Sequence, residues 1–475
     1  MRKTVSLEFR NLIKDTFPGL GKNESYWRFM RYILFGRRDK VTGEPVIGQR
    51  AVAKAEGKLN ILENSNAYCA AKFLEKFQND VMSKDTFSWS DWSLKDNEAR
   101  VASVKFPQKV IDAIESESYK LMLEDRVYFE TGRKFSKELQ KVDRELIKQE
   151  AYTYFDFCAP EAEDLFEYMN NLPVHNFSKV INNNFDAALL AAYRIKEPEK
   201  RRVQAEVLNT IRDVLQPFYI PSERGNTVRI FPINYSIAML QKNLRKIITK
   251  GWYEFDLASA QLSIAGKTWE IDEVQDFLRS GRKIWVELIN HYGIDALNLK
   301  ENNEEEYDAI KKVLKDSLYS LMYGMTKGNL ITFLNKGLIR FGIKDGGKKF
   351  LKYPLMAILF DARERRMAEL SDCDSVETIF SKRLNIKGTG AAREKCIRGV
   401  MAQQAQAVEL YLLLPVLDLA KTTKDFVITL WQHDGFSVNF TDSSKSARWV
   451  NKINQVVADR ANQLGIITKL EGGLL

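Results

Sequence analysis

The sequence predicts a mixed α/β (α+β) fold in which helices interrupt the strands of one small sheet. The segments TVRIFPI and WYEFDLA each have the character of a short strand, and residues 304–324 have the apolar spacing of a long helix. FVITLWQ and FSVNF carry alternating apolar residues on either side of His-Asp-Gly, as the two arms of a hairpin do. With 475 residues, of which 45% are hydrophobic and 28% charged, the chain is long enough for roughly two to four structural units.

The predicted elements change in character along the chain. Residues 1–150 are expected to be mostly helical and polar, with aromatic side chains among basic ones in SYWRFMRYILFGRRDK. That segment suits a nucleic-acid backbone and equally an ordinary amphipathic helix followed by a charged turn. Residues from about 160 to 218 are again helical up to Pro217 and Pro221. QLSIAGKTW begins a further helix, and a second long helix is expected over 394–414.

The composition limits the class of protein. The 72 Lys and Arg exceed the 63 Asp and Glu to give a net charge of +9, an excess shared by proteins that contact a polyanion and by many others. The four cysteines lie far apart without a CxxC pair, which indicates neither a disulfide framework nor a zinc site and fits a reducing compartment. We expect no signal peptide, and the most apolar run, 408–420, carries three residues that favour a buried helix over a membrane span: Glu409, Pro415 and Asp418. A cytoplasmic protein that does not enter a membrane is therefore predicted.

Asp434 stands at the turn of the predicted hairpin, between His433 and Gly435. A carboxylate held at a rigid turn between two buried strands is well placed to bind a metal ion. Asp-Gly is also the commonest pair of hairpin turn residues, so the turn by itself requires no function.

Asp256 ends the strand-like YEFD and precedes a helix that begins near Ala258, so its carboxylate is expected at a strand edge near solvent. Two such aspartates from separate strands of one sheet can hold two metal ions about 3.5–4 Å apart, the arrangement used for phosphoryl transfer. The alternative is that Asp256 only caps the helix.

The helix at 304–324 presents a repeating polar face. Lys311, Lys315, Tyr319 and Tyr323 recur every four residues and therefore lie on one side of it. Two ammonium groups followed by two aromatic rings form a surface suited to a nucleoside triphosphate, with charges for the phosphates and rings for the sugar and base. An ordinary amphipathic helix, ended by Gly324, explains the same pattern without function.

Together these three segments resemble motifs A, B and C of the family A DNA polymerases and of their relatives, the phage-type single-subunit RNA polymerases. Motif A of that family is a strand-terminal Asp, here in DLASAQLSI. Motif B is Lys, three residues, an aromatic, three residues and Tyr-Gly, here KDSLYSLMYG, with Lys311 where an Arg usually stands one turn earlier. Motif C is His-Asp followed by Glu or Ser, and here by Gly435.

Two further matches extend the resemblance. Arg229 in NTVRIFPI stands where the family has an Arg at the primer end, and Arg398 and Gln406 repeat the eight-residue spacing of its helix at the primer–template minor groove. The resemblance implies a right-hand polymerase fold with a palm sheet, helical fingers and a thumb. Its implied parts are an N-terminal, mostly helical region of unknown role (1–150), the thumb (151–224), the palm with motif A (225–275), the fingers with motif B (276–395) and the palm with motif C (396–475).

The resemblance also implies a two-metal mechanism. Asp256 and Asp434 would hold two Mg²⁺ ions, for which Mn²⁺ can substitute, with the Leu257 carbonyl as a further ligand. Lys311 and Lys315 would hold the triphosphate, and Lys315 would also act in catalysis by protonating the pyrophosphate. The other implied contacts are to the sugar and base of the nucleotide (Tyr319, Tyr323 and Gln261) and to the primer–template (Arg229, Arg398, Gln406 and His433).

The spacing of the motifs favours DNA synthesis. Lys315 follows Asp256 by 59 residues and precedes Asp434 by 119, as in the compact DNA polymerases, whereas phage RNA polymerases carry larger insertions. Gln261 stands five residues after Asp256, where the DNA polymerases have a Glu that blocks a ribose 2′-hydroxyl. Its amide is nearly as large but can donate a hydrogen bond to that hydroxyl. Gly435 removes a carboxylate, which is closer to the RNA enzymes.

The predicted function is therefore a template-directed DNA polymerase that extends a primer with dNTPs. A single-subunit RNA polymerase, a primase-like enzyme, a family A enzyme that copies RNA and a degenerate fold that only binds nucleic acid are the alternatives. The expected partners are a primer–template and nucleoside triphosphates, and accessory proteins are left open. No 3′–5′ exonuclease is expected, because the Asp-x-Glu sequences at 96–98 and 143–145 lie in polar, helix-like surroundings.

Overall fold

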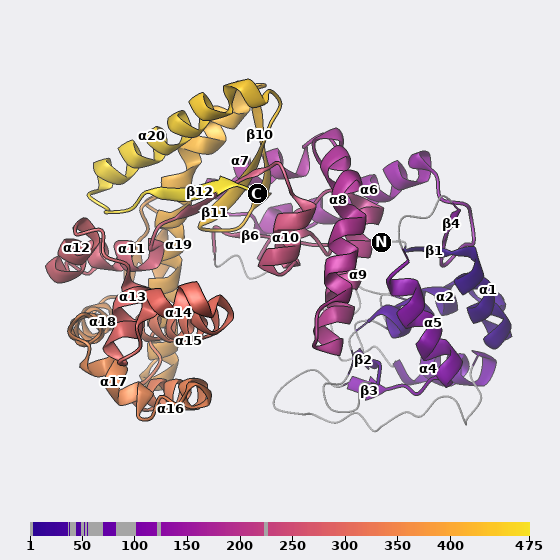
Figure 1. Ribbon diagram of the computed structural model, residues 1–475, viewed down its shortest axis with the longest axis horizontal. Helices are drawn as coiled ribbons and strands as arrows, with labels where there is room; N and C mark the ends of the chain where they lie inside the picture. Colours follow the sequence, from indigo (N-terminus) through magenta and orange to yellow (C-terminus); the bar gives the residue numbers. More distant parts are fainter. Residues whose placement is uncertain are drawn as a thin grey trace.

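The structure is a computed structural model that describes residues 3–36, 38, 44–48, 52, 55, 70–81, 101–120, 125–222 and 227–475. It has the mixed character that the sequence predicts, with many helices around one four-stranded sheet. The N-terminal helices lie at one end of the long axis of the molecule. The helices that follow β7, the strand of this sheet that comes first in the sequence, lie at the other end (Figure 1).

The central sheet has the strand order β10-β11-β7-β12, and each of its pairings is antiparallel. Stacked aromatic rings run across its buried face, with ring centroids 5.0 Å apart for Phe255 and Phe436 and 6.0 Å apart for Trp431 and Phe436. Burial of these rings in one core holds β7, β10 and β11 together. The strands span β7 (Tyr253–Leu257), β10 (Phe426–Trp431), β11 (Gly435–Phe440) and β12 (Leu470–Leu474).

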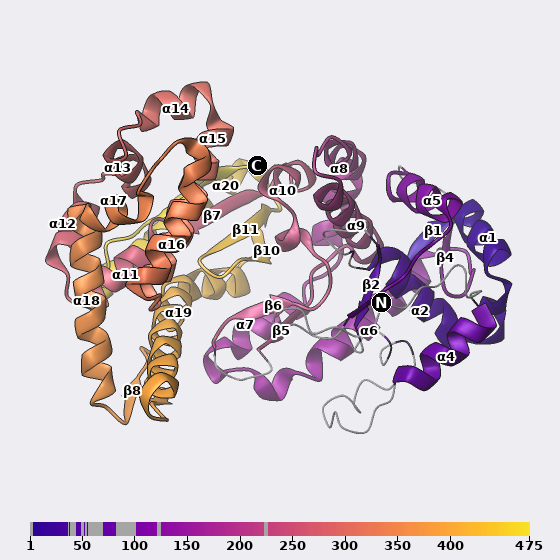
Figure 2. The same ribbon diagram turned by 90° about the horizontal axis from the view of Figure 1, so that it is seen from below.

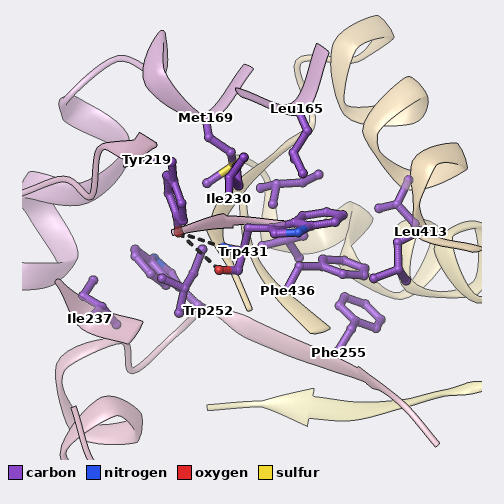
Figure 3. Packing of buried hydrophobic residues seen from close by; sticks show 14 of the residues in the cluster. Leu165, Met169, Tyr219, Ile230, Ile237, Trp252, Phe255, Leu413, Trp431 and Phe436 are labelled. Carbon is purple, nitrogen blue, oxygen red and sulfur yellow. Dashed lines mark hydrogen bonds between the residues drawn. The ribbon is translucent and has the colours of Figure 1, made fainter. Parts of the chain in front are cut away.

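The short strand predicted in TVRIFPI is observed, but the prediction that the strands form one small sheet is wrong. The TVRIFPI segment forms only the short strand β6 (Ile230–Pro232), which pairs with β5 (Tyr219–Pro221) in a separate two-stranded ribbon. The hydroxyl of Tyr219 accepts a hydrogen bond from the Trp431 N–H at 3.1 Å and so ties the ribbon to β10 (Figure 3). The ribbon is therefore a neighbour of the sheet and not a part of it.

Helices α7, α8, α9 and α10 share the hydrophobic core of the central sheet, and α6 packs mainly in a small cluster of its own with Val214 and Phe218. Helix α9 ends at Val214, ahead of the prolines that the sequence marks as the helix limit. The Asp-x-Glu sequence at 143–145 lies in a helix, as predicted, whereas 96–98 lie outside the described residues. These helices are α6 (Lys137–Tyr152), α7 (Pro160–Asn170), α8 (His175–Tyr193), α9 (Pro198–Val214) and α10 (Lys242–Ile248).

A second core lies among the helices between β7 and α19. The predicted helix at 304–324 is observed as α15 (Glu304–Met322), and Gly324 follows it with a φ of 88°, which explains why the helix ends there. Leu314, Leu318 and Leu321 are buried in this core. The other elements of this part are α11 (Ala260–Thr268), α12 (Asp272–Arg279), α13 (Ile284–His291), α14 (Ala296–Asn302), α16 (Lys327–Leu338), α17 (Gly346–Lys352), α18 (Pro354–Ser371), β8 (Ser375–Glu377) and β9 (Arg383–Asn385).

The N-terminal region has a core of its own, which contains many aromatic side chains from Phe9 to Phe129. It is held to α9 by buried ion pairs, including Lys3 with Glu206 and Arg126 with Asp213. Its elements are β1 (Thr4–Ser6), α1 (Leu7–Thr16), α2 (Glu24–Phe35), β2 (Val46–Gly48), α4 (Ala70–Val81), β3 (Val101–Ser103), α5 (Gln108–Ser118) and β4 (Arg126–Tyr128).

Two long helices, α19 (Gly390–Thr422) and α20 (Ser446–Leu464), pack on each other and on the sheet. α19 extends the predicted helix at both ends and continues through Pro415, which cannot donate to the Tyr411 carbonyl. Arg460 of α20 donates to that carbonyl at 3.3 Å instead. In the described part of the chain, α19 is the one helix long and apolar enough to cross a membrane, and 61% of its most apolar window is buried in the protein.

Candidate active site

Asp256 lies in β7, and Asp434 directly precedes β11, the strand that pairs with β7. Gly435 stands opposite Asp256 in the antiparallel register, and the Leu257 N–H donates a hydrogen bond to the Asp434 carbonyl oxygen at 2.9 Å. These backbone contacts hold the two aspartates next to each other. The strand boundaries differ slightly from the prediction, because β7 continues through Leu257 and Gly435 belongs to β11 instead of the turn.

Asp256 does not cap the helix that follows it. Helix α11 begins at Ala260, and its N-cap residue Ser259 has a left-handed backbone with a φ of 52° and no side-chain cap. The Ala258 N–H donates to the Lys469 carbonyl at 2.8 Å, so pairing with the β12 segment continues beyond Asp256. The capping alternative is therefore wrong.

Asp256 and Asp434 are not neutralised by a close partner. Among the described residues, neither carboxylate accepts a hydrogen bond or forms an ion pair. The Asp256 side chain reaches solvent, yet burial by the surrounding protein and the charge of Asp434 raise its pKa to about 7, while Lys315 acts in the opposite direction. A cation between the two carboxylates would turn this repulsion into attraction, so the pair fits divalent metal binding. Groups of three or more His, Cys, Asp or Glu that could hold a metal are absent from the described residues.

Glu471 is a neighbour of Asp256 that the sequence analysis missed. It lies opposite Asp256 in the pairing of β12 with β7, and its charge contributes to the raised pKa of Asp256. The surrounding sequence, LEGGLL, has two glycines and no apolar alternation, so no signal marked it as a strand beside the site.

The polar face of α15 is close enough to the aspartates to interact with them electrostatically. Lys315 is exposed, acts on Asp256 and lies with its Nζ 5.4 Å from the centroid of the Tyr319 ring. Burial raises the pKa of Tyr319 and Tyr323, and the Asp434 charge acts in the same direction on both. Burial lowers the pKa of Lys311, and the nearby Lys315 charge adds to this. The structure therefore places Lys315, Tyr319 and Tyr323 within electrostatic reach of the aspartate pair, whereas Lys311 interacts with other charges.

His433 and Arg229 meet beside the turn that carries Asp434. The His433 ring lies against Phe231 of β6, with centroids 5.2 Å apart. Burial and the nearby Arg229 charge lower the pKa of His433 to about 4, so its imidazole is neutral near pH 7. An efficient general base has a pKa near the working pH, so the low pKa of His433 makes it a poor candidate for that role.

Glu409 of α19 joins two of the predicted site residues. Its Oε2 accepts a hydrogen bond from Arg229 Nη2 at 2.6 Å, and its Oε1 accepts one from Gln261 Nε2. Glu409 therefore takes one of the two N–H groups of the Gln261 amide, and the prediction that this amide donates to a 2′-hydroxyl stays a prediction. In the sequence Glu409 is a single acid within an apolar run, three residues after Gln406 on the same predicted helix, and this position was the only signal for its role.

The two predicted minor-groove residues on α19 also have partners. Gln406 Oε1 accepts a hydrogen bond from the Thr227 hydroxyl at 2.5 Å. The stem of Arg398 crosses Gly324 so closely that a Cβ at position 324 would lie 2.2 Å from the Arg398 Cδ. These contacts join α19 to the β6 segment and to the end of α15. A role for the Leu257 carbonyl as a metal ligand stays a prediction.

No protein-family model matches the sequence, and no curated protein matches it. Among solved structures, the fold is similar to the POL domain of Pol1 from M. smegmatis in complex with a DNA primer-template and dNTP. The TM-score is 0.42 at 12% sequence identity, and the similar region covers 70% of this chain and 65% of that one.

Proposed function

We propose that the chain is a template-directed nucleotidyltransferase that extends a primer with dNTPs. One observation carries the proposal: two unpaired aspartates on neighbouring strands, Asp256 and Asp434, lie within electrostatic reach of a helix face with Lys315, Tyr319 and Tyr323. Two carboxylates suit a pair of divalent ions, a lysine suits a triphosphate, and aromatic rings suit a sugar and base. An amphipathic helix without function does not require this proximity to an acidic pair.

In this mechanism the side chains divide into metal-binding and nucleotide-binding groups. Asp256 and Asp434 would hold Mg²⁺, which when bound lowers the pKa of the attacking 3′-hydroxyl and stabilises charge on the phosphates. Lys315 and Lys311 would orient the triphosphate, and Lys315 would donate a proton to the departing pyrophosphate. The neutral ring of His433 would position the primer end instead of removing its proton.

The proposal assigns a role to each region of the chain. Residues 225–275 and 396–475 would act as the palm, 276–395 as the fingers and 151–224 as a thumb that guides duplex nucleic acid. The chain would lack 3′–5′ exonuclease activity. An RNA polymerase is the second candidate, and the observation that favours it is Gly435, where the DNA polymerases that this chain resembles have a further carboxylate.

Primer extension by the purified full chain tests the proposal directly. DNA and RNA templates should each be offered with a labelled primer, Mg²⁺, and either four dNTPs or four NTPs. Extension with dNTPs that depends on the template supports a DNA polymerase, and preference for NTPs supports the RNA polymerase candidate. Binding of the duplex without extension in Mg²⁺ or Mn²⁺ would leave only the nucleic-acid-binding alternative.

A further inference from the structure

Glu409 is a buried charge for which the proposed chemistry provides no use. It is 1% exposed and lies between Val408 and Leu410, which are buried as well. A buried carboxylate is tolerated only when charged or hydrogen-bonding partners compensate for the loss of water. Glu409 has two such partners, Arg229 and Gln261, one for each of its oxygens.

The contact with Glu409 determines which way the Gln261 amide is turned. Burial raises the pKa of Glu409, and the ion pair with Arg229 acts in the opposite direction. In the structure the NH₂ group of Gln261 faces Glu409 and donates to its Oε1. Gln261 is itself buried, at 5% exposed, and in the described structure its carbonyl Oε1 has no hydrogen-bond partner.

The same group of side chains adjoins the residues proposed to contact the nucleotide. Gln261 and Tyr323 line one cavity of about 390 Å³ between α11, α15 and α19. The charge of Glu409 also contributes to the raised pKa of Tyr319 and Tyr323, so it lies within electrostatic reach of both. Glu409 of α19 is thus close to the proposed nucleotide-contacting groups of α11 and α15, although it is itself buried.

We infer that Glu409 sets the sugar selectivity of the enzyme as a positioning residue, by fixing Gln261 through its amide nitrogen. Held in this way, Gln261 is a fixed barrier at the 2′ position of the incoming sugar. The inference rests on the proposed function, because it assigns Gln261 to the sugar of a bound nucleotide. It also means that a carboxylate at position 261 is compatible with this chain only if position 409 loses its charge, since two adjacent buried carboxylates repel each other.

The first experiment is a double-mutant cycle on sugar discrimination, the ratio of kcat/KM for dATP over ATP opposite a template T. Gln261→Ala should lower the ratio about tenfold, and Glu409→Gln should lower it about fivefold because Gln261 is no longer held. In the Gln261→Ala background, Glu409→Gln should have no further effect on the ratio. Asp418→Asn, which changes an exposed charge on the same helix, is the matched control and should leave the ratio unchanged.

The second experiment exchanges the two side chains and does not depend on activity. Gln261→Glu alone should lower the Tm, and the exchanged variant Gln261→Glu/Glu409→Gln should recover most of that loss, because one carboxylate again faces one amide. An exchanged variant no more stable than Gln261→Glu would overturn the inference, as would a Glu409→Gln variant that slows dATP and ATP equally. If the wild-type protein extends primers and Glu409→Gln leaves the dATP/ATP ratio of kcat/KM unchanged, this inference alone is overturned. Wild-type protein that extends no primer removes the proposed function together with it.

Discussion

Gly435 of β11 lies directly opposite Asp256 of β7, and a Cβ atom at position 435 would stand 3.0 Å from Asp256 Oδ1. The same atom would approach the Phe255 carbonyl oxygen to 2.6 Å, which is closer than side-chain atoms come to backbone. The glycine therefore makes room for the carboxylate on the next strand. A larger residue after the His-Asp pair would require β7 and β11 to shift.

Gly435→Ala should reduce both stability and nucleotide addition. Overpacking against backbone costs about 1–3 kcal/mol, and movement of Asp256 should lower kcat by about tenfold or more. Thermal unfolding and single-nucleotide addition measure the two effects. Gly473→Ala in β12 is the matched control, because its added Cβ would meet nothing within 4 Å. Equal behaviour of the two variants would show that β11 yields easily at this position.

Asp256→Asn and Asp434→Asn should each abolish metal-dependent addition while duplex binding persists. The amide keeps the shape of the side chain but loses the charge that holds a divalent ion, so a loss in kcat of at least about 100-fold is expected. Rapid-quench addition and fluorescence anisotropy with a labelled duplex measure the two properties. Asp372→Asn, at an exposed position after α18, serves as the control. Extension at the wild-type rate by either site variant would contradict the assignment.

Magnesium binding should depend on pH near neutrality. Only the ionised form of Asp256 is a ligand, and its pKa of about 7 means that a proton must leave when metal binds below that pH. The apparent affinity should therefore fall with decreasing pH, approaching tenfold per unit well below pH 7, and should level off above it. Titration calorimetry with Mg²⁺ alone, from pH 5.5 to 8.5 in two buffers, measures affinity and proton release.

The Lys315→Ala variant provides an internal check on this titration. Lys315 lowers the pKa of Asp256, so its removal should move the transition to higher pH. An affinity that stays constant between pH 6 and 8 in the wild-type protein would mean that Asp256 does not bind the ion.

Lys315→Ala should also weaken nucleotide binding specifically. Loss of a charge-assisted contact with the triphosphate should raise the KM for dNTP by about tenfold, with little change in the Kd for primer–template. Lys312→Ala, an exposed lysine on the same helix outside the predicted face, is the matched control. Steady-state kinetics of both variants decides the point, and an unchanged KM in a folded Lys315→Ala protein would make α15 a structural helix.

The sequence alone predicted the elements that depend on local periodicity. The arms of the hairpin and the helix carrying Lys315 appear where the apolar spacing places them, because such patterns bury one face of each element whatever packs against it. Gly324 ends that helix through its own backbone freedom. The acidic and aromatic candidates of the site could likewise be identified from the sequence, because they lie on these predicted elements.

Tertiary structure decided which elements are neighbours and how each side chain is held. The sequence pattern of β6 is that of a strand in the central sheet, but β6 pairs with β5 in a separate ribbon. Glu471 lies opposite Asp256 because β12, whose sequence has no strand pattern, pairs with β7. Gln261 donates a hydrogen bond to Glu409, which is 148 residues away in the sequence. Local sequence determines which donors and acceptors a residue has, whereas its charge state and hydrogen-bond direction depend on partners that only the folded chain brings close.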